Sequence, residues 1–121
     1  MEKNEICVIY GKDYKEMTKK ILRTSELAEL IPSKDTLVGI KPNLVSPSEA
    51  SYGATTHPEI VAGILEYLQE NGFQRMVILE GSWVGLVTRW KSVVIGVCVR
   101  GMVWNFGTRK RMVLTKRNVG E

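Results

Sequence analysis

Short apolar runs alternate with amphipathic stretches along most of the chain. Three runs are typical of buried strands, because they are short, rich in β-branched side chains and bounded by turn residues: residues 5–10 (EICVIY), 36–40 (TLVGI) and 75–79 (RMVIL). Residues 12–30 and 57–70 repeat apolar side chains every three or four positions, which predicts helices. The order β-α-β-α-β predicts an α/β fold, with a three-layer, Rossmann-like core around a three-stranded parallel sheet, in an incomplete domain.

The second predicted helix carries a start signal and a stop signal. Thr56 and Glu59 fit a T-x-x-E capping box, in which the threonine hydroxyl accepts a hydrogen bond from the first turn. Pro58 falls in that turn, where its missing N–H costs little. Asn71-Gly72 supplies the left-handed residue that ends many helices.

The first helical stretch is expected to break once. Thr24 and Ser25 can interrupt it and start a short second piece, which Pro32 ends. Asp13 lies just ahead of the stretch, where a carboxylate either caps the helix or belongs to a ligand site. We favour the cap.

The carboxyl ends of the predicted strands mark the place where chemistry is expected. Ligands of open α/β sheets bind outside these ends. Here the ends are residues 11–13, 41–43 and 80–83, and the loop 43–57, rich in small and polar residues, lies on the same edge. A loop this long inside a compact domain is usually functional or disordered.

Composition sets broad limits on the class of protein. The 121 residues are 44% hydrophobic and 25% charged, which fits a single globular domain. No apolar run approaches the roughly 20 residues of a membrane span, and the N-terminus lacks the features of a signal peptide. The two cysteines, Cys7 and Cys98, form no disulfide framework, so we expect a cytoplasmic protein.

The net charge of +4 is distributed unevenly. Residues 1–84 carry 9 Lys+Arg and 12 Asp+Glu, whereas residues 85–121 carry 8 Lys+Arg and a single acid, Glu121. The second part also favours arginine over lysine. We therefore divide the chain into residues 1–85 and a basic tail, residues 86–121.

Three separated strings, GIKPNLVSP, GATTHPEIV and ILEGSWVG, resemble the DUF362 family over about residues 4–85. Many members carry an appended ferredoxin-like 4Fe–4S domain and are described as iron–sulfur centre proteins. The resemblance implies an α/β domain of unsettled biochemical function with a redox association, and a ferredoxin-like domain or protein as a partner. This chain contains no C-x-x-C-x-x-C run, so its cofactor is unknown.

The resemblance to the family ends after residue 85, and within residues 4–85 it marks the residues of a candidate site. After Gly85 the family pattern is lost, and the sudden absence of acids in residues 86–121 suggests translation in a shifted frame, a truncation or a divergent end. Residues 92–99 (SVVIGVCV) could add a strand. The marked residues that we take as the candidate site are Lys41, Asn43, Thr55, Thr56, His57 and Glu80.

Each candidate residue has a functional and a structural interpretation. Lys41 and the free N–H groups at the start of the second helix, with Asn43, Thr55 and Thr56, could bind a small anion. Lys41 could equally be a surface residue, Asn43 could shape the loop, and we expect Thr56 to act mainly as a helix cap.

His57, at the start of the second predicted helix, and Glu80, at the end of a predicted strand, are the acid–base candidates, because a histidine and a carboxylate can exchange protons with a ligand. Packing of His57 on the loop and a backbone-accepting role for Glu80 are the alternatives. We assign no metal ligand, because no second histidine or cysteine lies near His57 in the sequence.

The function predicted from these features is binding of a small anionic ligand within a redox-linked protein. One alternative is a non-catalytic interaction or nucleic-acid module that uses the basic tail. Another is a metal-dependent enzyme. Whether the chain is an enzyme stays open, and we expect neither membrane association nor, on balance, nucleic-acid binding.

Overall fold

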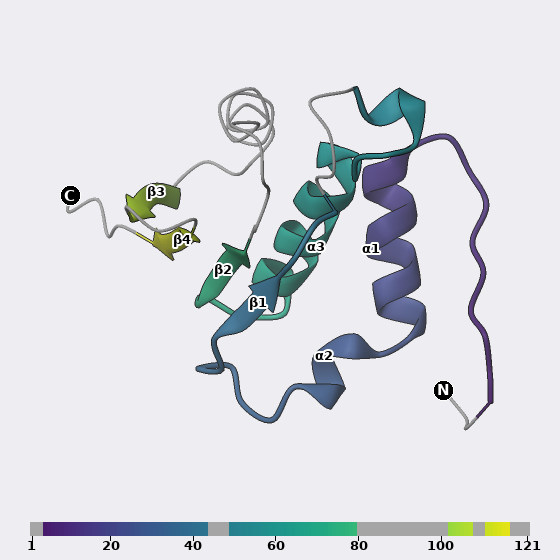
Figure 1. Ribbon diagram of the computed structural model, residues 1–121. Coiled ribbons are helices and arrows are strands. Elements are labelled where there is room, and N and C mark those ends of the chain that lie inside the picture. Colours follow the sequence, from purple (N-terminus) through teal and green to yellow (C-terminus); the bar gives the residue numbers. More distant parts are fainter. Residues whose placement is uncertain (1–3, 44–48, 80–101, 108–110, 117–121) are drawn as a thin grey trace.

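The computed structural model describes residues 4–43 and 49–78 with their side chains, and the backbone of residues 79, 102–107 and 111–116. Its elements follow the order α1 (Tyr14–Thr24), α2 (Leu27–Leu30), β1 (Val38–Ile40), the 3₁₀ turn η1 (Ala50–Tyr52), α3 (Pro58–Glu70), β2 (Met76–Leu79), β3 (Met102–Gly107) and β4 (Arg111–Lys116) (Figure 1).

The described strands form one mixed sheet in the order β1-β2-β4-β3. β1 and β2 run parallel, with Val38 opposite Met76 and Ile40 opposite Ile78. β4 pairs antiparallel with the other edge of β2, and β3 pairs antiparallel with β4. The protein is therefore an α/β protein with two parallel strands extended by an antiparallel hairpin.

The predicted first strand, residues 5–10, is wrong. These residues lie outside any strand and run along the outer side of α1 in Figure 1. Their side chains at Ile6, Val8 and Tyr10 are 85%, 84% and 100% exposed. Strand propensity describes how a side chain fits an existing pleated surface, and it does not supply a partner strand. With β1 and β4 on its two edges, β2 offers no place for this segment. The predicted three-stranded parallel sheet and three-layer core are not confirmed.

The predicted helix signals are confirmed at three points. Asp13 caps α1, accepting a hydrogen bond from the N–H of Glu16 at 3.0 Å. The helical stretch breaks after Thr24, where Glu26 adopts a left-handed φ of 53°. Asn71 caps the carboxyl end of α3, and Gly72 follows it at a φ of 86°.

The hydrophobic core lies between α3 and the parallel strands. Leu65 and Leu68 of α3 and Met76 of β2 are fully buried. The complete cluster of buried residues is Ala28, Ile40, Val61, Ala62, Leu65, Tyr67, Leu68, Phe73, Met76 and Ile78. Tyr67 also joins α2 to α3, because its hydroxyl accepts a hydrogen bond from the N–H of Ala28 at 3.0 Å.

Helices α1 and α3 run parallel and in close contact. Tyr14, at the start of α1, lies against His57, just before α3. Arg23, near the end of α1, binds Glu70, at the end of α3, so the two helices have the same direction. Gly63 permits the contact, because a Cβ placed there would lie 2.7 Å from the carbonyl oxygen of Lys15. Both helices consequently begin at the same end of the molecule.

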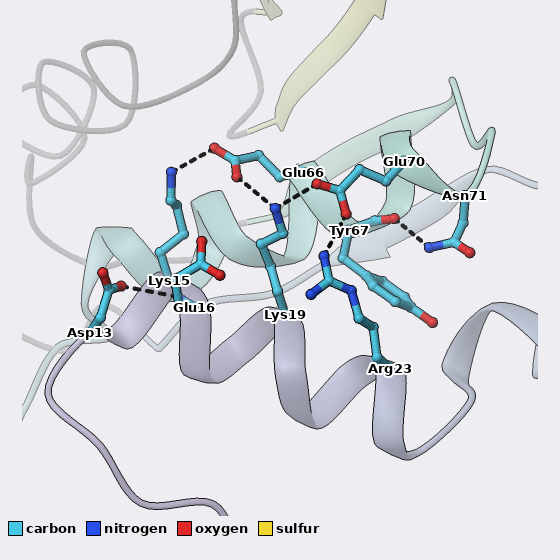
Figure 2. A network of polar contacts seen from close by, with 9 residues as sticks. All are labelled: Asp13, Lys15, Glu16, Lys19, Arg23, Glu66, Tyr67, Glu70 and Asn71. Atoms are coloured by element: carbon cyan, nitrogen blue, oxygen red, sulfur yellow. Dashed lines mark hydrogen bonds and ion pairs between the residues drawn. The ribbon is translucent and has the colours of Figure 1, made fainter.

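Four ion pairs connect the two helices (Figure 2). Glu66 binds Lys15 at 3.0 Å and Lys19 at 3.4 Å, while Glu70 binds Lys19 and, at 2.9 Å, Arg23. The Lys19 side chain is only 10% exposed. Glu66 and Glu70 therefore lie on the side of α3 that faces α1.

The ion pairs shift two pKa values in opposite directions. The hydrogen bond from Lys19, followed by that from Arg23, lowers the pKa of Glu70 below its ordinary value of 4.5. The hydrogen bond to Glu70 raises the pKa of Lys19 above 10.5; burial opposes this and Glu66 adds to it. Folding therefore favours the charged form of both groups.

This arrangement predicts a window of maximal stability. The contribution of Glu70 is complete above its unfolded pKa of 4.5 and is lost as the pH falls through its lower folded value. The contribution of Lys19 is complete below 10.5 and is lost as the pH rises through its higher folded value. We expect Glu70→Gln to flatten the acid side of a plot of melting temperature against pH. Glu29→Gln, an exposed change in α2, is the control and should leave the acid side unchanged. Equal profiles for the wild type and Glu70→Gln would contradict the prediction.

Candidate functional site

The end of β1 is joined to the start of α3 by two hydrogen bonds, and a backbone N–H is the donor in each. The N–H of Asn43 donates to the hydroxyl of Thr56 at 2.8 Å, and the N–H of Thr56 donates to the carbonyl of Asn43, also at 2.8 Å. We call this pair of contacts the Asn43–Thr56 clamp. It fixes two of the predicted site residues beside each other, with neighbouring Thr55 buried at 6% exposure.

The clamp corrects the predicted role of Thr56. The residue at the cap position of α3 is His57, and Pro58 is the first helical residue. The Thr56 hydroxyl is used in the clamp, so the predicted capping box does not form. No side chain caps α3. Pro58 has no N–H, and the N–H of Ile60 donates to the carbonyl of His57 at 3.0 Å, so the N–H of Glu59 is the one that the first turn presents to a ligand.

His57 lies where the two parallel helices begin. Its ring stacks on Tyr14, the first residue of α1, with ring centroids 4.1 Å apart and an interplanar angle of 21°. The side chain stays 28% exposed, so it can reach a ligand. Its Nδ1 atom lies 4.0 Å from Oε2 of Glu59.

Lys41 is exposed and follows β1 by one residue. Its ammonium makes one long hydrogen bond, 3.4 Å, to the carbonyl of the adjoining Pro42. Lys41 thus remains available to a ligand, and the clamp holds its segment next to the start of α3. The other predicted acid–base residue, Glu80, lies outside the described residues.

Sequence reasoning missed two residues of this site. Tyr14 was only one of the apolar positions at helical spacing in residues 12–30, and nothing in the sequence links it with His57. Glu59 was assigned to the capping box, although its spacing from His57 already placed both side chains at the start of one helix. The contacts depend on the parallel packing of α1 on α3, which is a tertiary feature.

Metal and cofactor donors are limited. In the two ranges with described side chains, no group of three or more His, Cys, Asp or Glu residues could hold a metal ion. A 4Fe–4S cluster takes four cysteine thiolates, and this chain has only Cys7 and Cys98, so it does not fit such a cluster by itself. No described helix is long and apolar enough to cross a membrane.

These features define an α/β protein whose candidate site lies at the carboxyl end of a parallel strand. The family model for DUF362, a domain of unknown function, matches residues 38–102, from the first residue of β1 to the first residue of β3. The chain belongs to the DUF362 family. Neither the curated proteins nor the solved structures contain a match to it.

The match confirms the family resemblance and places it differently along the chain. The resemblance was expected over about residues 4–85, whereas the match begins at residue 38 and continues to residue 102. The match therefore includes the clamp and His57, and it also includes the first part of the basic tail. The boundary predicted at residue 85 stays a prediction.

Proposed function

We propose that this DUF362 protein binds a small anionic ligand where β1 ends and α1 and α3 begin. The observation that carries the proposal is the uncapped start of α3, held against the end of β1 by the Asn43–Thr56 clamp. A helix start concentrates partial positive charge on N–H groups that have no partner within the helix. Such groups are common ligands of phosphate and carboxylate.

The charges around this point are mixed. Lys41 adds an exposed ammonium. The start of α1 lies at the same end, but the Asp13 carboxylate already caps it. Glu59 opposes a bound anion, because it places a carboxylate in the first turn of α3. This carboxylate lies beside His57, so it influences both the charge of the site and the ring of His57.

The wider role is proposed on the family resemblance alone. In that role the anion site would belong to a redox-linked protein, with a ferredoxin-like domain or protein as its partner. Nothing in the described residues favours the two alternatives, a nucleic-acid module built on the basic tail or a metal-dependent enzyme.

A titration with inorganic phosphate tests the anion site. At constant ionic strength, we expect phosphate to shift most strongly the backbone amide resonance of Glu59, at the start of α3. Lys41→Gln should weaken binding about fivefold, because a charge contact at an exposed position contributes about 1 kcal/mol.

Lys20→Gln is the matched control. It removes the same charge from an exposed position farther along α1, and it should leave the affinity unchanged. If both substitutions weaken phosphate binding equally, the effect is one of overall charge. That result, or amide shifts spread over the surface without a maximum at the start of α3, would defeat the proposed function.

A further inference from the structure

One carboxylate oxygen at the candidate site has no hydrogen-bond partner. Among the buried side-chain polar atoms of the described residues, Oε2 of Glu59 is the one left without a partner. The remainder of the Glu59 side chain is accessible, with 46% of the side chain exposed. A buried carboxylate oxygen without a hydrogen-bond partner costs free energy. A donor close to it is therefore expected to pair with it when the site is in use.

The donor closest at hand is the ring of His57. Its Nδ1 atom is 4.0 Å from Oε2 of Glu59, slightly beyond hydrogen-bond length. Stacking on Tyr14 holds the plane of the ring, and the ring forms no hydrogen bond with another described residue. Among the residues with described side chains, the titratable groups in contact with it are Tyr14 from α1 and Glu59 from α3. Of these, Glu59 is the group placed to decide which ring nitrogen carries the proton.

We propose that Glu59 is a positioning residue for His57. By accepting a hydrogen bond from Nδ1–H it fixes the neutral tautomer that keeps a lone pair on Nε2. This step rests on the proposed anion site, because it makes Nε2 an acceptor toward the ligand. An acceptor requires a hydrogen on the bound group. The site therefore prefers an oxyanion that carries a proton, such as hydrogen phosphate, to sulfate, which carries none at neutral pH.

The tautomer can be measured without a ligand, because His57 is the only histidine in the chain. Nitrogen-15 chemical shifts of the ring, recorded at mildly alkaline pH where a histidine is ordinarily neutral, report which nitrogen is protonated. We expect the Nδ1–H form to predominate in the wild type and the Nε2–H form to gain in Glu59→Ala. Glu59→Gln keeps an acceptor of the same length, so it should produce a smaller change.

Glu29→Ala, an exposed change in α2, is the control and should leave the ring shifts as in the wild type. If Glu59→Ala does not fold, Glu59→Gln provides the comparison. Identical tautomer populations in the wild type and in the Glu59 variants would overturn the positioning role.

The ligand preference is tested separately by titrating phosphate and sulfate. Loss of one charge-assisted hydrogen bond is expected to weaken sulfate about tenfold relative to hydrogen phosphate. Glu59→Ala should reduce this difference. Equal affinity for the two anions would overturn the preference. Absence of phosphate binding together with a Glu59-dependent tautomer would defeat the proposed function and support the positioning role.

Discussion

Replacing Gly63 with valine is expected to lower the free energy of unfolding by about 3 kcal/mol. A Cβ at this position would lie 2.7 Å from the carbonyl oxygen of Lys15 and 2.9 Å from Cβ of Thr18. The nearer atom is backbone and cannot rotate away, so α1 must move from α3. That movement also separates Lys15 from Glu66, whose ion pair spans the two helices.

Packing and helix propensity predict opposite signs for the change in the free energy of unfolding of Gly63→Val. Valine is a better helix former than glycine, so propensity alone predicts a slight stabilisation. Urea unfolding of Gly63→Val, compared with the wild type, measures the difference through the midpoint of the transition. Lys20→Val introduces the same side chain at an exposed position of α1 and should cost well under 1 kcal/mol. Unchanged or increased stability of Gly63→Val would show that α1 and α3 are not in contact at this glycine.

Removing the Tyr67 hydroxyl is expected to cost about 2 kcal/mol, because the N–H of Ala28 would lose its acceptor in a buried position. Tyr67 is 2% exposed and Ala28 is 4% exposed, so water cannot easily replace the hydroxyl. Tyr67→Phe keeps the ring and therefore leaves packing in the core almost unchanged.

The matched control for Tyr67→Phe is Tyr52→Phe. Tyr52 lies in η1 and is 79% exposed, so loss of its hydroxyl should change stability by less than about 0.5 kcal/mol. Thermal unfolding of the two variants measures both effects. In addition, the amide proton of Ala28 should exchange faster with solvent in Tyr67→Phe. If the two variants are equally stable, the bond between α2 and α3 contributes nothing.

Local signals in the sequence predicted the helices better than the sheet. Asp13, Pro58 and Gly72 act through their own backbone or their nearest neighbours, and each lies where the sequence placed it. Strand pairing depends on distant residues. The segment 5–10 has the composition of a strand and yet pairs with no described strand. The second edge of β2 is instead occupied by β4, which was not predicted as a strand.

The hairpin of β3 and β4 was missed for a related reason. Its two runs, residues 102–107 and 111–116, are separated by three residues and contain several β-branched or aromatic side chains, which is a hairpin signal. The unusual charge of residues 86–121 suggested an anomalous end, but charge does not determine strand pairing. The strand considered at residues 92–99 lies outside the described residues.

The candidate site stays a prediction, and only some of its contacts follow from the sequence. The structure brings Asn43 and Thr56 together, as expected where the end of a strand lies near the start of the next helix. The Thr56 hydroxyl was assigned to the wrong partner, since two acceptor roles compete for it and a local pattern cannot rank them. Tyr14 could not be predicted, because its stacking on His57 depends on how closely α1 approaches α3.

The exposed segment 5–10 gives the protein two levels of local stability. Every residue of the described core lies between Ala28 and Ile78, so this segment adds nothing to the cooperative unit formed by the helices and the parallel strands. Opening of Ile6–Tyr10 exposes only the half-buried Cys7 and Ile9 and is expected to cost little free energy, whereas opening of α3 requires breaking the core. A protease would thus meet a cleavable extension that ends at Gly11, immediately before α1, whose start lies beside the proposed anion site at α3.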